Sequence, residues 1–258
     1  MSFFEQMLAS IGIGSAKVDT RLKRGQVRVG EQLEGIVHIQ GGNAEQQIDT
    51  IYLHLMTQYT REQNDQTVKA NTAVTKWQLS SPFTIRAGES KQVPFSFTVP
   101  LNTPVSASRS PVWLQTGLDI ASAIDPGDSD RLQVLPHPHV QVVLDAVTGM
   151  GFQAKTVTNE YSSRLGRGLP FVQEFEFYPS SGFRSAIKEL ELVFFVEPEG
   201  LQVLVEVDRR ARGLAGLFEQ ALELDERKQT ARFSREELRQ GSRSIAEQLS
   251  RIIESHSR

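Results

Sequence analysis

The feature that most constrains the fold is an alternation of apolar and polar residues that runs from residue 16 to about residue 134. The stretch "IDTIYLHLM" shows it clearly, because isoleucine or leucine stands at every second position from Ile51 to Leu55. Successive side chains of a strand point to opposite faces, so this period predicts half-buried β-strands. About seven such runs with turn residues between them predict an antiparallel β-sandwich.

The second half of the chain has a different pattern, and we expect the change at "LPHPH", residues 135–139. Its two prolines favour an extended hinge. Beyond it, strands and helices are interspersed, and a hairpin is predicted about Glu197–Gly200. Ser234 and Glu237 form a predicted capping box at which the last helix begins. This last helix is predicted to run without interruption to the C-terminus. The sequence thus predicts two domains, residues 1–135 and an α+β domain of residues 136–258.

Composition excludes several classes of protein. The formal net charge is −3 and the pI is about 6.0, which does not favour nucleic-acid binding. Cysteine is absent, so disulfides, thiolate nucleophiles and cysteine-based zinc sites are excluded. No apolar run reaches the roughly 18 to 20 residues that a transmembrane helix needs. The N-terminus lacks the basic start of a signal peptide, and we expect a cytoplasmic protein.

The first residues predict a short helix, because Phe4, Met7, Leu8 and Ile11 recur at spacings of three and four. Two roles fit this pattern. The helix either covers one end of the domain behind it or docks on a partner or a membrane surface.

An acidic stretch, "AIDPGDSDRL", raises the question of a metal site. It holds Asp125, Asp128 and Asp130, and His137 follows in "HPH". The spacing fails the calcium-loop pattern, because the twelfth position counted from Asp125 is Pro136 instead of glutamate. Asp-Pro-Gly-Asp favours a turn between strands. A metal-dependent hydrolase that uses these side chains is the weaker alternative.

Other catalytic signals are missing. The sequence contains no nucleophile elbow and no phosphate-binding glycine loop. The segments "EFEFYP" and "ELELVFFVEPE" are rich in glutamate, but alternation is expected to place these side chains together on one solvent-exposed face of a sheet. We therefore expect no enzyme and no cofactor.

Two groups of residues are candidates for binding. Arg209, Arg210 and Arg212 cluster directly after Asp208, and arginine captures carboxylates and phosphates well. They predict either an internal ion-pair network or a basic patch for an acidic partner, a phosphate ligand or anionic lipid. The other group lies on the long strand, where Tyr52, His54, Met56 and Tyr59 predict an adaptable partner-binding face. Packing between sheets or between domains is the alternative for this face.

Four stretches give the chain a resemblance to a known family: "ASIGIGSAKVDT", "WLQTGLDI", "LPFVQEFEF" and "VDRRARGLAGLFEQAL". They are similar to the bacterial sporulation-control family called SpoOM (sporulation stage-zero M), and the resemblance extends to about residue 226. The resemblance implies an arrestin-like β-sandwich followed by a second domain, and "VPFSFTVPLNTPVSA" is similar to the arrestin-type proline corner. It also implies a non-catalytic adaptor that binds protein partners through strand edges, loops and concave faces. An anion-binding module that uses the arginine cluster is the alternative function.

Overall fold

The computed structural model describes residues 16–64, 66–120, 127–181, 183–184, 187–208 and 230–257. The chain divides into two compact units. The first unit comprises residues 1–58, 71–106 and 111–135, and the second comprises 59–70, 107–110 and 136–258. The prediction that the chain forms separate domains on either side of residue 135 stays a prediction.

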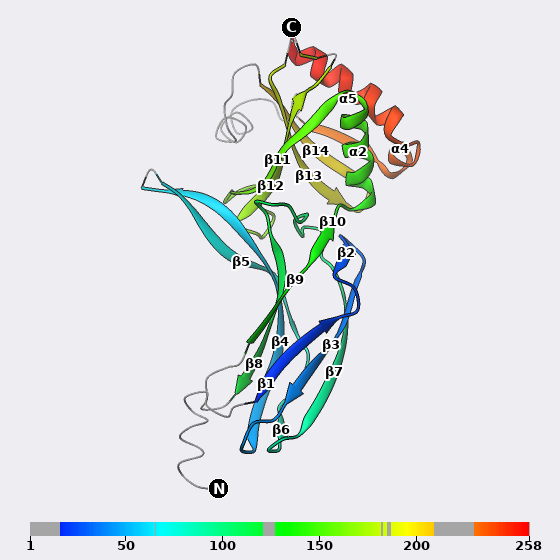
Figure 1. Cartoon of the computed structure of the whole chain (residues 1–258). Coiled ribbons are helices and arrows are strands. Elements are labelled where there is room, and N and C mark those ends of the chain that lie inside the picture. Colours follow the sequence, from blue (N-terminus) through cyan, green and yellow to red (C-terminus); the bar gives the residue numbers. More distant parts are fainter. Residues whose placement is uncertain are drawn as a thin grey trace. The chain divides into compact units, whose positions relative to one another are not determined.

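The first unit contains two antiparallel sheets, one with the order β1-β3-β7 and one in which β4 lies between β8 and the strands β5 and β6 (Figure 1). Strand β9 pairs with the other side of β8, and the short β2 and β10 pair in parallel. The strand bounds are β1 (Lys17–Leu22), β2 (Gln26–Arg28), β3 (Gln32–Gln40), β4 (Gln46–Gln63), β5 (Gln66–Gln78), β6 (Phe83–Ile85), β7 (Ser90–Thr98), β8 (Val112–Ile120), β9 (Gly127–Arg131) and β10 (Gln133–Leu135).

The core of this unit lies between the two sheets and confirms the predicted alternation. Ile51, Leu53 and Leu55 of β4 are fully buried and share one hydrophobic cluster with Val37 and Ile39 of β3. The side chains between them on β4 are half-buried. Burial of one face of each sheet therefore explains why these segments form strands.

The second unit is an antiparallel meander with helices (Figure 1). Neighbouring strands follow one another in the order β11-β12-β13-β14-β15, and the predicted hairpin pairs Glu197 with Gly200. The bounds are α2 (Pro138–Gly149), β11 (Phe152–Tyr161), β12 (Phe171–Pro179), β13 (Glu189–Glu197), β14 (Gly200–Asp208), β15 (Thr230–Ser234), α4 (Arg235–Arg239) and α5 (Ser242–Ser257).

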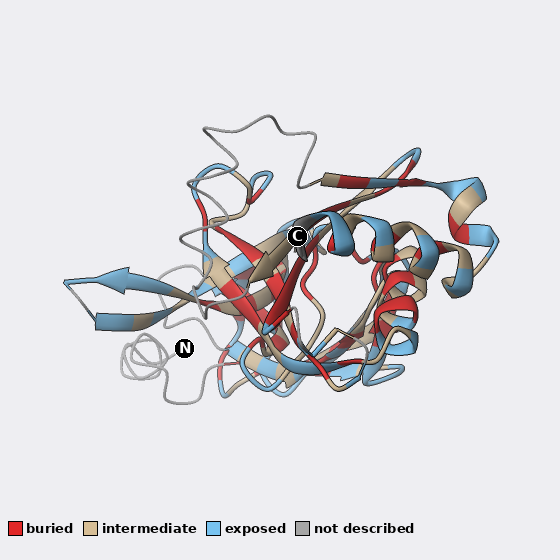
Figure 2. Cartoon of the chain, turned by 90° about the horizontal axis from the view of Figure 1, so that it is seen from above, coloured by how far each residue is buried: buried red, intermediate tan, exposed pale blue. Residues whose placement is uncertain are grey.

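Helices α2 and α5 contact each other and both contact β14. Buried and exposed residues alternate along both helices (Figure 2), as expected where one side packs on an apolar sheet face. The capping box is present: the Ser234 side chain accepts a hydrogen bond from the Glu237 amide, and the Glu237 side chain accepts one from the Ser234 amide. The prediction of one uninterrupted last helix was wrong, because Gly241 adopts a positive φ of 92° and separates α4 from α5.

The end of β4 contributes to the second unit. Thr60 pairs with Glu160 of β11, and its hydroxyl donates to the Glu160 carboxylate over 2.6 Å. Tyr59 is buried, so its predicted place on the partner-binding face was wrong. Its ring stacks with that of Phe171, at 6.0 Å between ring centroids, and with that of Tyr161, at 6.4 Å. Residues from the first quarter of the sequence therefore help to build the core of the second unit.

The glutamate-rich strands depart from the sequence prediction in one respect. The register places Glu176 opposite Glu191 and Glu191 opposite Glu206, so these side chains do share one face of the sheet. That face was expected to be exposed to solvent, but Glu174, Glu189 and Glu191 are buried. Alternation fixes which side chains share a face, whereas the covering of that face depends on chain segments remote in sequence.

Candidate protein-interaction surface

The outer face of β4 brings Tyr52, His54 and Met56 together. These side chains alternate with fully buried residues and are themselves half-buried. The rings of Tyr52 and His54 lie 6.2 Å apart, and the ammonium of Lys76 on β5 lies 3.3 Å from the centre of the Tyr52 ring. A cation over an aromatic face is attracted by the ring quadrupole. Tyr52 is therefore held in place from the neighbouring strand.

His54 is kept neutral by its surroundings. Burial, followed by the positive charge of Lys76, lowers the pKa of its imidazole. Its Nε2 atom is buried and has no hydrogen-bond partner among the described residues. A neutral imidazole next to a tyrosine and a methionine gives this face both apolar area and unused hydrogen-bonding capacity.

The sequence did not identify two residues that lie beside this face. Trp113 of β8 is paired with Met56, and Lys76 reaches Tyr52 from β5. Both lie in segments that were predicted as strands, "SPVWLQTGLDI" and "VTKWQLS". The missing information was the pairing register, which alternation within one strand does not reveal.

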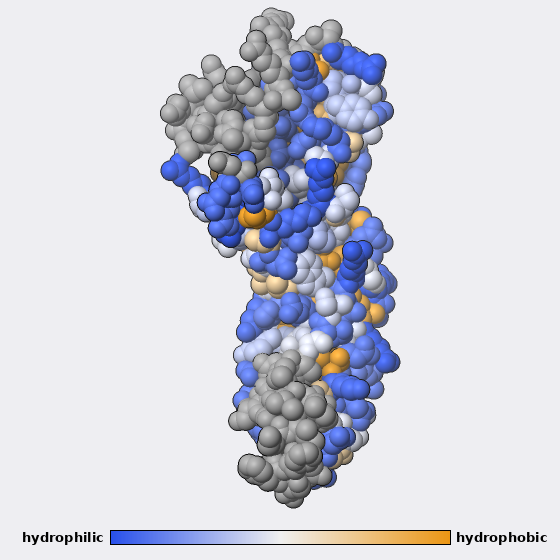
Figure 3. Space-filling view, turned by 60° about the vertical axis from the view of Figure 1, so that its left-hand side comes forward, coloured by the Kyte–Doolittle hydropathy of each residue, from blue (hydrophilic) through white to orange (hydrophobic). Residues whose placement is uncertain are grey.

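Strand β5 forms an edge of this sheet. Among the described strands it pairs only with β4, and most of its residues are exposed or half-buried (pale blue and tan in Figure 2). On the face shown in Figure 3, hydrophobic residues lie in small separate patches among hydrophilic ones. An unpaired edge presents backbone N–H and C=O groups to which another strand can pair, and Lys69 and Lys76 are the kind of residue that limits indiscriminate pairing.

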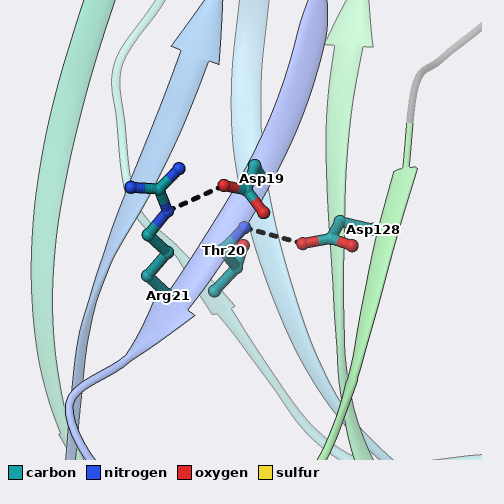
Figure 4. A network of polar contacts seen from close by, with 4 residues as sticks. All are labelled: Asp19, Thr20, Arg21 and Asp128. Atoms are coloured by element: carbon teal, nitrogen blue, oxygen red, sulfur yellow. Dashed lines mark hydrogen bonds and ion pairs between the residues drawn. The ribbon is translucent and has the colours of Figure 1, made fainter.

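The acidic stretch has a structural role in the first unit. Asp128 and Asp130 lie in β9 and not in the predicted turn, and Asp125 lies outside the described residues. The carboxylate of Asp128 accepts a hydrogen bond of 2.6 Å from the backbone amide of Thr20 in β1 (Figure 4). Asp128 therefore connects the edge strands of the two sheets.

Asp130 sits in a more apolar environment than an ordinary aspartate. Burial, together with the charge of Asp128 and then of Asp19, raises the pKa of Asp130 to about 6. Its Oδ2 atom is buried and has no hydrogen-bond partner among the described residues. Asp19 itself forms an ion pair with Arg21 at 2.9 Å (Figure 4).

His137 serves a different purpose. It is the N-cap of α2, where its Nδ1 atom accepts a hydrogen bond of 3.2 Å from the amide of His139. Within the part of the chain that the structure describes, no group of three or more histidine, aspartate or glutamate side chains is arranged to hold a metal ion. The predicted metal alternative gains no support from the described residues.

Two predicted elements lie outside the described residues: the N-terminal helix and the cluster of Arg209, Arg210 and Arg212. Among the described helices, none combines the length and apolar character needed to cross a membrane.

The comparisons with known proteins agree with this description. The family model described as "SpoOM protein" matches residues 4–211. The chain belongs to the SpoOM family. It is 40% identical over 257 residues to the sporulation-control protein Spo0M of Bacillus subtilis (strain 168), and the match covers 99% of each chain.

The solved structures include a SpoOM family member with the same fold. The crystal structure of the sporulation control protein Spo0M from Bacillus subtilis superposes with a TM-score of 0.86 at 38% identity. The match covers 94% of this chain and 99% of that chain. The resemblance recognised from the four sequence stretches is thereby confirmed, and so is the largely β fold with a C-terminal helix.

Proposed function

We propose that this chain is a non-catalytic regulatory protein with a role in the control of sporulation, and that it acts by binding another protein. The family and the name of the Bacillus subtilis relative support the regulatory role. The described residues contain no group arranged to hold a metal ion, and the sequence lacks the usual catalytic motifs. An arrestin-like mode of action, through strand edges and sheet faces, follows from this proposal.

The observation that carries the proposal is the edge strand β5 beside the outer face of β4. A partner strand that pairs with β5 would form main-chain hydrogen bonds with it. The side chains of the partner strand would contact the neighbouring outer face of β4. Tyrosine and methionine suit such a surface, because the first supplies rigid contact area and the second adapts its shape. Tyr52, Met56 and Lys76 are accordingly assigned to partner recognition.

Neighbouring proline substitutions in β5 test the edge. Consecutive residues of a strand direct their N–H groups to opposite sides, so Thr72→Pro and Ala73→Pro remove one donor that faces β4 and one that faces outward. The substitution that faces β4 is expected to lower the melting temperature clearly. The variant that loses the outward-facing donor is expected to be more stable than the first variant. It is also expected to abolish capture of the partner from a lysate of the native host, measured by affinity purification and mass spectrometry.

Substitutions on the face provide a second measurement with a matched control. Tyr52→Ala and Met56→Ala are expected to weaken partner capture, whereas Asn71→Ala at an exposed position of β5 is not. Full capture by the outward-facing proline variant would contradict binding at the edge. Turnover of a metabolite by the pure protein, lost on replacing one buried histidine or acid, would contradict the non-catalytic role.

The regulatory role is tested separately in cells. Expression of this chain in a Bacillus subtilis strain that lacks its own Spo0M is expected to restore normal yields of heat-resistant spores. Expression of the outward-facing proline variant is expected not to restore them. Equal spore yields with the unmodified chain and with this variant would show that the role in sporulation does not depend on the β5 edge.

The anion-binding alternative depends on Arg209, Arg210 and Arg212 and stays a prediction. Flotation with vesicles of anionic lipid distinguishes it from protein binding. Binding to these vesicles that disappears in the Arg209→Glu/Arg210→Glu variant would favour the alternative.

A further inference from the structure

A row of three glutamates crosses the sheet of the second unit. Glu176 of β12 lies opposite Glu191 of β13, which lies opposite Glu206 of β14. We call these residues the acidic row. Like charges directly opposite one another destabilise a sheet, so this arrangement needs either protons or cations to be tolerated.

Further carboxylates lie beside the acidic row. Glu174 is two residues from Glu176 on the same side of β12, and the opposed residues Glu189 and Asp208 flank the row on its other side. Lys155 forms ion pairs with Glu176, at 2.9 Å, and with Glu189. It is the only described cation that forms ion pairs with these glutamates.

The centre of this carboxylate group is withdrawn from water. Glu174 and Glu191 are each only 3% exposed. One carboxylate oxygen of each, and Oε2 of Glu206, is buried without a hydrogen-bond partner among the described residues. An unpartnered buried carboxylate is costly, which makes these oxygens acceptors with unused capacity. Glu176 and Glu206, at the two ends of the row, are half-buried and can still be reached from solvent.

The titration of these groups agrees with the geometry. Burial is the first cause that raises the pKa of Glu206 to about 8, followed by the charges of Glu191 and Asp208. Burial likewise raises the pKa of Glu174 to about 10, followed by a hydrogen bond with the Glu191 side chain and by the charges of Glu191, Glu176 and Glu160. The pKa of Glu191 is raised for the same first reason. At neutral pH the face therefore holds protons that an arriving cation would displace.

The other end of the same sheet face shows how a cation is accommodated here. Arg167 stacks over the ring of Phe195 at 4.1 Å and donates to Glu197 over 2.9 Å and to Gln202 over 2.6 Å. Phe195 and Glu197 lie on the same side of β13 as Glu191, because the intervals between them are even. This face thus already binds one guanidinium by an acid, an amide and an aromatic ring.

We propose that the acidic row is a second binding site, which receives an arginine- or lysine-bearing segment of a partner protein. Charge complementarity carries this assignment, because the row offers unpartnered acceptor oxygens and its described surroundings supply only Lys155 as an ion-pair partner. Binding to Glu206 releases its proton, so the affinity rises as pH rises through about 8. The proposal rests on the proposed function only in that the ligand belongs to a protein.

Calorimetric titration of the full chain with a short arginine-rich peptide tests the site without the natural partner. At low ionic strength we expect binding that is tighter at pH 9 than at pH 6.5 and that releases protons. A peptide with glutamate in place of arginine is expected not to bind. Because the peptide assay does not involve β5, its failure and the failure of the proposed edge interaction are distinguishable.

Two variants that each remove one carboxylate provide the control. Glu206→Gln is expected to weaken the peptide about tenfold, as loss of a charge-assisted hydrogen bond would. Glu236→Gln removes an acid of the same unit whose side chain is 82% exposed on α4, and it is expected to leave the affinity unchanged. Hydrogen exchange is expected to show slower exchange of the β13 and β14 amides when the peptide binds.

Three results would overturn the proposal. The first is no binding to the unmodified chain at pH 9. The second is equal weakening by Glu206→Gln and Glu236→Gln, which would mean a general effect of net charge. The third is binding only after Arg209, Arg210 and Arg212 are replaced by alanine, which would mean that the chain's own arginines compete for the site.

Discussion

The hydroxyl oxygens of Thr20 and Thr116 lie 2.6 Å apart in the core of the first unit. Thr20 belongs to β1 in one sheet and Thr116 to β8 in the other, and both are buried. One hydroxyl therefore donates a hydrogen bond to the other in a place that water does not reach.

Replacing one of these threonines is predicted to lower the free energy of unfolding by more than half of the loss that replacing both causes. Thr116→Val leaves the Thr20 hydroxyl without this partner, and the expected loss is about 1–3 kcal/mol of the free energy of unfolding. In the Thr20→Val/Thr116→Val variant no buried hydroxyl of this pair remains. Urea unfolding of the two single variants and the double variant measures the coupling, and strictly additive losses would contradict it.

Gly35 is predicted to be essential for close packing within the first sheet. A Cβ atom added there would lie 2.6 Å from the Phe95 ring and 2.7 Å from the carbonyl oxygen of Arg21. Gly35→Ala is therefore expected to lower the free energy of unfolding by about 1–3 kcal/mol. Gly117→Ala is the matched control in a strand, because no atom lies within 4 Å of its added Cβ. Equal unfolding midpoints for the two variants would refute this explanation.

The stability of the protein is predicted to fall at alkaline pH in part through Glu206. Its pKa of about 8 in the folded chain exceeds the value of about 4.3 expected for an unfolded chain, so the folded state holds the proton more tightly. The resulting stabilisation is complete below about pH 4.3 and is lost as pH rises through about 8.

Glu206→Gln is expected to flatten this part of the stability profile, which for one proton slopes by at most about 1.4 kcal/mol per pH unit. Denaturant unfolding between pH 5 and pH 9 provides the measurement, with Glu236→Gln as the control. Parallel profiles for the variant and the unmodified chain would show that burial and the charges of Glu191 and Asp208 do not raise the pKa of Glu206 as described.

The capping box at the start of α4 is predicted to stabilise the end of the second unit. Ser234→Ala removes the acceptor for the Glu237 amide and is expected to cost about 1 kcal/mol. Ser244→Ala in α5 removes a hydroxyl whose bond to Gln240 is exposed, and it serves as the control. Thermal unfolding compares the two, and a larger loss for the control would argue against the cap.

Periodicity was sufficient to predict the strands of the first unit but not how they pair. The buried positions Ile51, Leu53 and Leu55 follow from alternation alone. The contact of Lys76 with Tyr52 depends instead on the relative register of two strands, which each strand's own pattern leaves undetermined.

The acids show the same division between local and non-local information. The turn residues around Asp128 suggested a loop, whereas its hydrogen bond to the Thr20 amide, from a segment far away in sequence, keeps it within a strand. Glu174 and Glu191 were predicted to face solvent because glutamate is rarely buried. Their burial is set by tertiary packing and therefore gave no signal in the sequence.

The ring of Tyr59 stacks with those of Phe171 and Tyr161, although more than a hundred residues of chain separate it from either partner. A gene fragment that begins at codon 136 would encode these two rings without the tyrosine that stacks with them. Residues of β4 belong to both units, so a chain truncated in this way would leave the buried ring of Phe171 without its stacking partner.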